Sequence, residues 1–82
     1  MNATTDYLAI DLGAESGRTI VGRFNGEQIS LEVMHRFANG PVSVFGSLYW
    51  DPLGLYAEIR KGMGLYAKQN KHNLAGIGLD TW

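Results

Sequence analysis

The chain has 82 residues, of which seven are Lys or Arg, eight are Asp or Glu and none is Cys, so its formal net charge is −1. This length allows one small domain, and the lack of cysteine excludes a disulfide-stabilised secreted scaffold and a cysteine nucleophile. A near-neutral charge without a basic cluster argues against binding to nucleic acid. No stretch approaches the roughly 18 apolar residues of a membrane span, and no basic signal-peptide segment precedes the first apolar run. We therefore expect a soluble, cytoplasmic protein that binds neither nucleic acid nor membrane.

Three strands are predicted in the first half of the chain. Residues 7–12 form a nearly continuous apolar run, which is typical of a strand in the middle of a sheet. Residues 18–24 are rich in β-branched side chains, and Asn25-Gly26 after them is a strong signal for a hairpin. The three strands are therefore expected to form an antiparallel meander.

The third strand is predicted from about Glu27 to Phe37. Alternation places its apolar residues on one face together with His35; these are Ile29, Leu31, Val33 and Phe37. The other face then has Gln28, Ser30, Glu32, Met34 and Arg36. We expect His35 to be partly buried and satisfied by a hydrogen bond, rather than to bind a metal or act in catalysis.

A helix is predicted after a loop at residues 38–46 and a short extended piece at residues 48–50. Asp51-Pro52 marks its start, because Asp caps free N–H groups and Pro fits the first helical position. One apolar stripe follows at spacings of four, four and three, formed by Leu55, Ile59, Met63 and Tyr66. Three glycines at positions 54, 62 and 64 weaken the helix. Basic side chains suit its C-terminal end, and these are Lys68, Lys71 and His72.

A last strand at residues 74–79 follows this helical crossover, so we expect it to be parallel to the strand beside it. The predicted fold class is α/β, with the order β-β-β-α-β and a mixed sheet that has a helix on one face. The chain stops at Asp80-Thr81-Trp82, directly after a buried strand, as a fragment does. Apolar sheet surface would then stay exposed, and we expect poor solubility or association.

The segment Asp11-Leu12-Gly13-Ala14-Glu15-Ser16-Gly17-Arg18 carries most of the candidate chemistry. Its glycines let backbone N–H groups approach an anion, and Ser16 and Arg18 add donors for phosphate oxygens. Asp11 ends a buried strand, where a carboxylate is costly unless it is hydrogen-bonded or faces a cation such as Mg²⁺. A Walker A loop is excluded by the spacing of the glycines, by arginine in place of lysine and by the strand that follows. These residues alone also fit an ordinary hairpin in which Asp11 accepts backbone N–H bonds.

Together with Asn39-Gly40, Tyr49-Trp50-Asp51 and residues 76–82, this segment resembles the start of the FGGY family of sugar kinases. Within that family, Gly-Ala-Glu-Ser-Gly-Arg paired with Asp-Thr-Trp is most similar to members that phosphorylate L-rhamnulose. The resemblance implies that residues 1–82 are the N-terminal part of a ribonuclease H-like lobe, as in actin, Hsp70 and hexokinase. It also implies ATP- and Mg²⁺-dependent transfer of the γ-phosphoryl group to the 1-hydroxyl of L-rhamnulose.

The same resemblance assigns roles to individual residues. The ATP-phosphate hairpin comprises Ala14, Glu15, Ser16, Gly17 and Arg18, and Asp11 lies beside the metal, which it contacts through water. The edge of the sugar pocket comprises Asp80, Thr81 and Trp82. The family's catalytic base lies further along the chain, so residues 1–82 alone are expected to be inactive.

Alternatives remain open from the sequence. The chain also fits another FGGY kinase, acting on fuculose, xylulose or glycerol, or a non-catalytic nucleotide-binding or scaffold protein of the same superfamily. Asp80 fits either a catalytic base or a residue that holds the pocket loop by hydrogen bonds, and the second is favoured. Trp50 is expected to pack rather than to bind sugar. Substitution of Gly17 by valine is expected to abolish nucleotide binding and to leave the fold intact.

Overall fold

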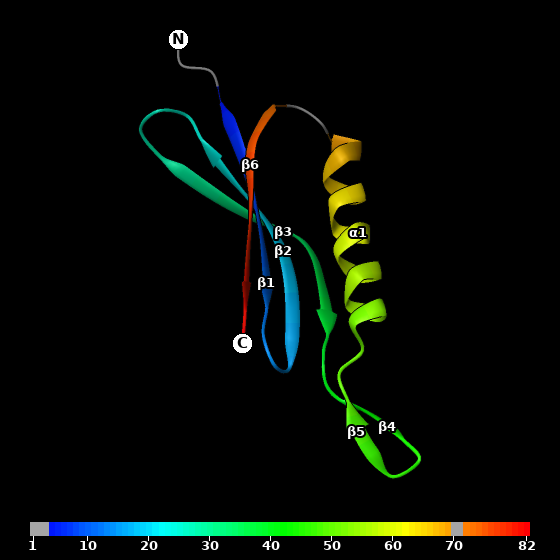
Figure 1. Cartoon of the computed structure of the whole chain (residues 1–82). Helices are drawn as coiled ribbons and strands as arrows, with labels where there is room; N and C mark the ends of the chain where they lie inside the picture. Colours follow the sequence, from blue (N-terminus) through cyan, green and yellow to red (C-terminus); the bar gives the residue numbers. More distant parts are fainter. Residues whose placement is uncertain (1–3, 70–71) are drawn as a thin grey trace.

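A four-stranded sheet with the strand order β3-β2-β1-β6 carries one helix, α1 (Figure 1). The computed structural model describes residues 4–69 and 72–82. The elements are β1 (Thr5–Leu12), β2 (Ser16–Phe24), β3 (Ile29–Ala38), β4 (Val42–Val44), β5 (Ser47–Tyr49), α1 (Pro52–Gln69) and β6 (Asn73–Thr81). β1 is antiparallel to β2 and parallel to β6, and β2 is antiparallel to β3. The predicted meander, crossover helix and mixed sheet are confirmed.

β4 and β5 form a second, two-stranded sheet within residues 42–49, where the sequence predicts a loop followed by a short extended piece. The turn between them consists of Phe45 and Gly46, which have φ angles of 49° and 80°. A phenylalanine rarely adopts positive φ, so this turn has no sequence signal of the Asn-Gly kind. The loop prediction was therefore wrong for residues 42–44.

The start of α1 is capped as the sequence predicts. The backbone N–H of Gly54 donates to Asp51 Oδ1 at 3.0 Å, and the N–H of Leu55 donates to the Asp51 carbonyl at 3.0 Å. The helix ends at Gln69 with Lys68 in its last turn, whereas Lys71 lies outside the described residues. His72 lies beyond the end of the helix, and its Nδ1 is 3.2 Å from Oδ1 of Asp6, a partner that the sequence does not predict.

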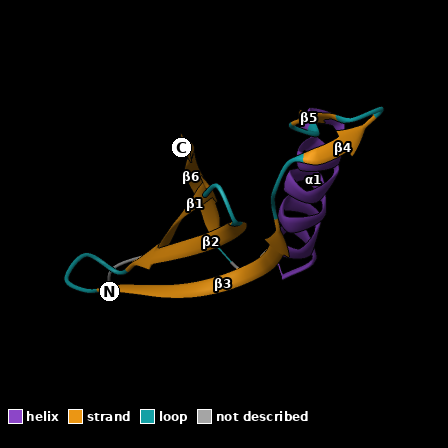
Figure 2. Cartoon of the chain, turned by 90° about the horizontal axis from the view of Figure 1, so that it is seen from below, coloured by secondary structure: helices purple, strands orange, loops and turns teal. Residues whose placement is uncertain are grey.

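α1 packs against the part of the sheet formed by β2 and β3 (Figure 2). Gly62 is buried at this contact. A larger residue would not fit there, because its Cβ would lie 2.2 Å from Thr19 Oγ1. The predicted apolar stripe of α1 is confirmed, and its residues meet the sheet in two clusters. One contains Leu8, Val21 and Tyr66 with Met34 and Met63, and the other contains Ile10, Leu12 and Phe37 with Leu55, Ile59 and Met63.

A β-bulge interrupts the alternation of β3. Thr19 pairs with His35 and Ile20 pairs with Val33, so Met34 is the extra residue on β3. One extra residue exchanges the two faces of a strand. The predicted grouping of the apolar residues of β3 was therefore wrong.

The two halves of β3 face opposite sides of the sheet as a result. Phe37 is buried against α1, and the His35 ring nitrogen Nε2 pairs with Glu58 on the same side, which confirms the expected hydrogen bond. Ile29, Leu31 and Val33 lie on the other face, where they are exposed.

The face of the sheet away from α1 is largely apolar and uncovered. A concavity of about 460 Å³ on it is lined by Tyr7, Leu8, Ala9, Ile20, Gly22, Phe24, Ile29 and Leu31. Leu31 is 73% exposed, although a leucine is usually buried. The expected exposure of apolar sheet surface is confirmed. Within the described residues, α1 is the one helix, and it is not apolar enough to cross a membrane.

Candidate functional site

The hairpin between β1 and β2 has an exposed tip at Ala14 and Glu15. It is closed by the N–H of Gly13, which donates to the carbonyl of Ser16 at 2.8 Å. No described residue accepts a hydrogen bond from the N–H groups of Ala14 and Glu15. The tip therefore offers backbone donors of the kind that bind anions.

Asn39, immediately after β3, contacts this hairpin twice. Its side-chain amide donates to the carbonyl of Gly13 at 2.7 Å, and its backbone N–H donates to the carbonyl of Glu15 at 2.9 Å. The sequence marks Asn39 only as part of a motif and gives it no role. Its contacts depend on how β3 ends beside the hairpin, which local patterns do not reveal.

A row of charged residues crosses all four strands beside the hairpin. The cross-strand partners are Arg36 with Arg18, Arg18 with Asp11, and Asp11 with Asp80. Residues opposite one another in a sheet project from the same face, and this row lies on the face away from α1. Arg18 Nη2 donates to Asp11 Oδ2 at 2.7 Å, and the two side chains are 37% and 38% exposed.

This row leaves donors and acceptors free for a ligand. Among residues 4–69 and 72–82, the guanidinium of Arg18 has no hydrogen-bond acceptor other than Asp11, and no side chain donates to Asp11 Oδ1. Asp11 and Asp80 are two carboxylates on adjacent strands, and Mg²⁺ is typically held by one or two carboxylates together with waters and phosphates. The residues present therefore fit a magnesium ion beside a phosphate group.

Gly17 is buried, unlike its neighbours at the tip. A Cβ on it would lie 2.2 Å from Cζ of Phe37, so the Phe37 ring occupies the space over this glycine. Gly17 is thus required by packing on the α1 side. The contact argues against the expectation that valine at position 17 leaves the fold intact, because its side chain would overlap the Phe37 ring.

The three residues predicted at the sugar pocket project differently. Asp80 belongs to the charged row, whereas Thr81 pairs with Leu12 and therefore projects from the opposite face. Trp82 donates its backbone N–H to the Leu12 carbonyl at 3.1 Å, and its ring lies 4.5 Å from that of Trp50, between centroids. Trp50 therefore packs against Trp82, although both side chains are exposed, so the choice between packing and sugar binding stays a prediction.

The end of β6 and the β1–β2 hairpin lie at the same end of the four-stranded sheet (Figure 1), and the contact between the Trp50 and Trp82 rings links them to the segment before α1. A groove on the open face continues from them along β1 and β6. It has a volume of about 440 Å³ and is lined by Ala9, Ile10, Asp11, Ile20, Gly78, Leu79 and Asp80.

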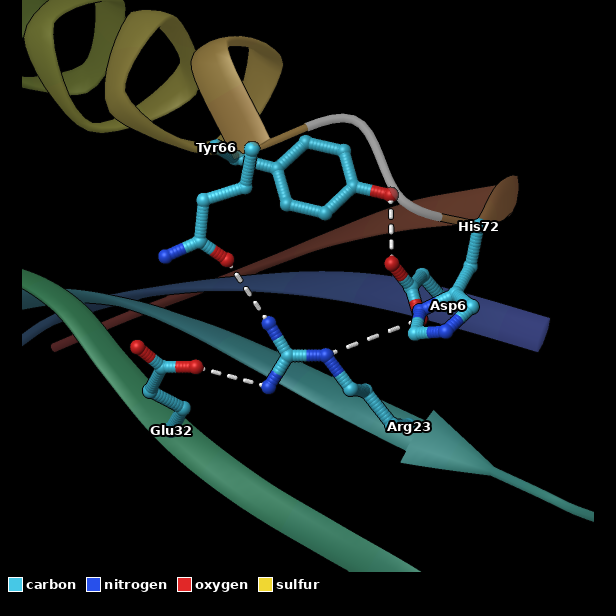
Figure 3. A network of polar contacts seen from close by, with 6 residues as sticks. Asp6, Arg23, Glu32, Tyr66 and His72 are labelled. Carbon is cyan, nitrogen blue, oxygen red and sulfur yellow. Dashed lines mark hydrogen bonds and ion pairs between the residues drawn. The ribbon is translucent and has the colours of Figure 1, made fainter. Parts of the chain in front are cut away.

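A second polar cluster lies on the α1 side of the sheet (Figure 3). Its centre is Asp6, which is 1% exposed and accepts a hydrogen bond from the Tyr66 hydroxyl at 2.7 Å. His72 Nδ1 and Arg23 Nε lie 3.2 and 4.0 Å from Asp6 Oδ1. Burial, together with the hydrogen bond to Asp6, raises the pKa of Tyr66 to about 12.

Arg23 joins this cluster to β3 and α1. It donates to Glu32 Oε1 at 2.7 Å and to Gln69 Oε1 at 2.9 Å. The sequence reasoning missed the whole cluster. A signal was present, because Asp6 shares the alternation of Leu8 and Ile10 and so points toward the core. The partners of Asp6 come from three other segments, and Glu32 of β3 joins through Arg23, so the cluster links the end of α1 to the sheet.

The chain is similar in sequence to curated rhamnulokinases. No family model matches it. It is 44% identical over 77 residues to the rhamnulokinase of Bacteroides thetaiotaomicron, a match that covers 94% of this chain and 16% of the relative. It is 38% identical over 76 residues to the rhamnulokinases of Lactiplantibacillus plantarum and Bacillus subtilis, with 93% of this chain and 15% and 16% of these relatives covered.

The similarity thus extends over nearly the whole chain, and the chain spans about one sixth of the length of the curated relatives that it matches. The resemblance to sugar kinases expected from the sequence is confirmed, and the chain corresponds to one segment of the rhamnulokinases.

Proposed function

We propose that this chain forms the nucleotide-phosphate wall of an ATP-dependent kinase that phosphorylates the 1-hydroxyl of L-rhamnulose. The observation that carries the proposal is the β1–β2 hairpin, whose free N–H groups lie beside the Arg18–Asp11 pair in a chain related to rhamnulokinases. We also propose that residues 1–82 are the N-terminal part of a ribonuclease H-like lobe. A substrate pair of ATP and a sugar fits a cytoplasmic location.

The hairpin residues bind the phosphates of ATP in this proposal. The N–H groups of Ala14 and Glu15 and the hydroxyl of Ser16 donate to phosphate oxygens, and Gly17 contributes only backbone. Arg18 adds a guanidinium, which gives strong charge-assisted hydrogen bonds. The carboxylate of Glu15 is exposed and is directed to solvent, since a negative charge beside the phosphates would be repulsive.

Asp11 holds Mg²⁺ through water in this proposal, with Asp80 next to it on β6. When bound, the ion supplies positive charge that offsets the charge on the phosphates. The Arg18–Asp11 pair is partly exposed on the open face, where each side chain can also meet a ligand of the opposite charge.

Asp80, Thr81 and Trp82 form the edge of the sugar pocket in this proposal. Asp80 orients the pocket by hydrogen bonds, while Trp82 packs against Trp50. No residue of this chain is assigned the role of catalytic base. Phosphoryl transfer needs a carboxylate that accepts the proton of the sugar hydroxyl, and we expect that group in the rest of the enzyme, so residues 1–82 alone are inactive.

A chimera tests the proposal directly. Residues 1–82 of this chain replace the matching segment of the Bacteroides thetaiotaomicron rhamnulokinase, and ADP release is measured with ATP and L-rhamnulose. We expect activity with L-rhamnulose, and a folded chimera without kinase activity would contradict the proposal.

The variant Arg18→Met tests the phosphate-binding role within the active chimera. Loss of a charge-assisted hydrogen bond is expected to raise KM for ATP about tenfold or more and to leave KM for the sugar unchanged. The matched control is Arg60→Met, since Arg60 is an exposed arginine on α1 that lies over the Tyr56 ring at 5.9 Å. An unchanged KM for ATP in Arg18→Met would refute the role of the charged row.

A further inference from the structure

Asn39, at the end of β3, is bonded to two carbonyl groups of the β1–β2 hairpin, one just before its tip and one within it. The side-chain amide binds the carbonyl of Gly13, and the backbone N–H binds the carbonyl of Glu15. Both bonds are short, at 2.7 and 2.9 Å. Two of the carbonyl oxygens of the hairpin are therefore engaged by one residue that is 26 positions away from Gly13 in sequence.

Carbonyl oxygens carry partial negative charge, so they oppose an anion that approaches the same loop. Asn39 keeps these two oxygens in hydrogen bonds, while the N–H groups of Ala14 and Glu15 have no acceptor among the described residues. The loop consequently presents two N–H donors to a ligand, while two of its carbonyl acceptors are already engaged. A loop preorganised in this way loses little entropy when it binds.

The geometry points to Asn39 as a positioning residue for the nucleotide phosphates: it holds the hairpin in the conformation that exposes its N–H groups. This inference rests on the proposed function, because it assumes that the hairpin binds ATP. Asn39 does not touch the phosphates in this scheme. It acts through the carbonyls of Gly13 and Glu15.

Substitution of Asn39 should spare the fold. Its side chain is half-buried and lines a cavity of about 260 Å³ between the end of β3 and the start of α1, outside both apolar clusters. The variant Asn39→Ala removes the bond to Gly13. The variant Asn39→Asp keeps the size of the side chain but replaces the donor with a negative charge against a carbonyl oxygen.

Asn25 provides the matched control. It lies in the β2–β3 turn, where its Oδ1 accepts hydrogen bonds from the N–H groups of Glu27 and Gln28 at 2.9 and 2.8 Å. Asn25→Ala thus also removes a turn-stabilising asparagine side chain, in a different hairpin.

The experiment measures steady-state kinetics and thermal unfolding of the chimera with each substitution. For Asn39→Ala we expect KM for ATP to rise about tenfold, because one hydrogen bond that orders the hairpin is lost. KM for L-rhamnulose should stay unchanged. Asn39→Asp should raise KM for ATP at least as much. Asn25→Ala should lower the unfolding temperature about as much as Asn39→Ala does, but it should leave KM for ATP unchanged.

The inference is overturned if the Asn39 variants raise KM for ATP no more than Asn25→Ala does, because the role is then only structural. Should Asn39→Ala fail to fold, the isosteric Asn39→Asp decides by the same comparison. The variant Arg18→Met separates the two proposals. If it leaves KM for ATP unchanged, the hairpin site itself fails, whereas an effect in Arg18→Met without one in Asn39 variants refutes only the role of Asn39.

Discussion

The contact between Gly17 and Phe37 gives the sharpest prediction about the hairpin. In Gly17→Ala the new Cβ would lie 2.2 Å from Cζ of Phe37, whereas an ordinary contact between carbon atoms is about 3.5 Å or longer. The ring would have to move by roughly 1 Å or more. It has little room, since Phe37 is buried in a cluster against which Leu55, Ile59 and Met63 of α1 pack. Overpacking of this kind costs about 1–3 kcal/mol.

Gly22→Ala is the matched control on the same strand. Its Cβ would meet Leu31 Cδ2 at 3.5 Å, an ordinary contact on the open face. Neither Gly17 nor Gly22 has a positive φ angle, so alanine is compatible with the backbone at both positions. We expect Gly22→Ala to be neutral or to stabilise by about 0.4–1 kcal/mol through the unfolded state.

Urea unfolding of the chimera, followed by circular dichroism, measures both variants against the parent. The double variant Gly17→Ala with Phe37→Leu should recover part of the loss, with a coupling of about 1 kcal/mol or more between the two positions. Equal stability of Gly17→Ala and Gly22→Ala, or the absence of coupling to Phe37, would refute the packing explanation. Nucleotide binding would then become the better account of the glycine.

Three further predictions concern the rest of the sheet. Gly62→Ala should destabilise the chain by about 1–3 kcal/mol, because its Cβ would lie 2.2 Å from Thr19 Oγ1, while Gly64→Ala, which meets open space, should be harmless in the same urea titration. The pKa of Tyr66 is raised to about 12 from an ordinary value of 10.0, so the folded state holds the phenol proton more tightly. That stability is complete below pH 10 and is lost as the pH rises to 12; Tyr66→Phe should abolish this loss in unfolding curves at pH 9 to 12, and an unchanged slope would contradict it. Leu31→Lys should reduce self-association of residues 1–82 in sedimentation experiments, and equal association would show that the open face is not responsible.

Most elements could be predicted because local signals and packing agree. The apolar run of β1, the β-branched residues of β2 and the cap of α1 each act within a few residues. The bulge at Met34 could not be predicted. It depends on how β2 and β3 align over α1, and a single extra residue then reverses every later side chain of the strand.

The candidate site shows the same division. The Asp11–Arg18 pair follows from a short hairpin, since residues on both sides of a tight turn face each other. The alignment of Asp80 with Asp11 depends on the parallel register of β1 and β6, which a long crossover does not determine. The bonds from Asn39 and the buried cluster around Asp6 also join distant segments, so only the folded structure reveals them.

The contact between Trp50 and Trp82 provides an intrinsic spectroscopic signal for the folding of this chain. These are the two tryptophans of the sequence, and their rings lie 4.5 Å apart between centroids with planes tilted by 46°. Indole transitions at this distance couple, so the near-ultraviolet circular dichroism should contain a paired band only when both rings are in place. Trp82 follows β6 and Trp50 precedes α1. Indole fluorescence should therefore report, without any added label, when these two segments come together and when a ligand enters beside them.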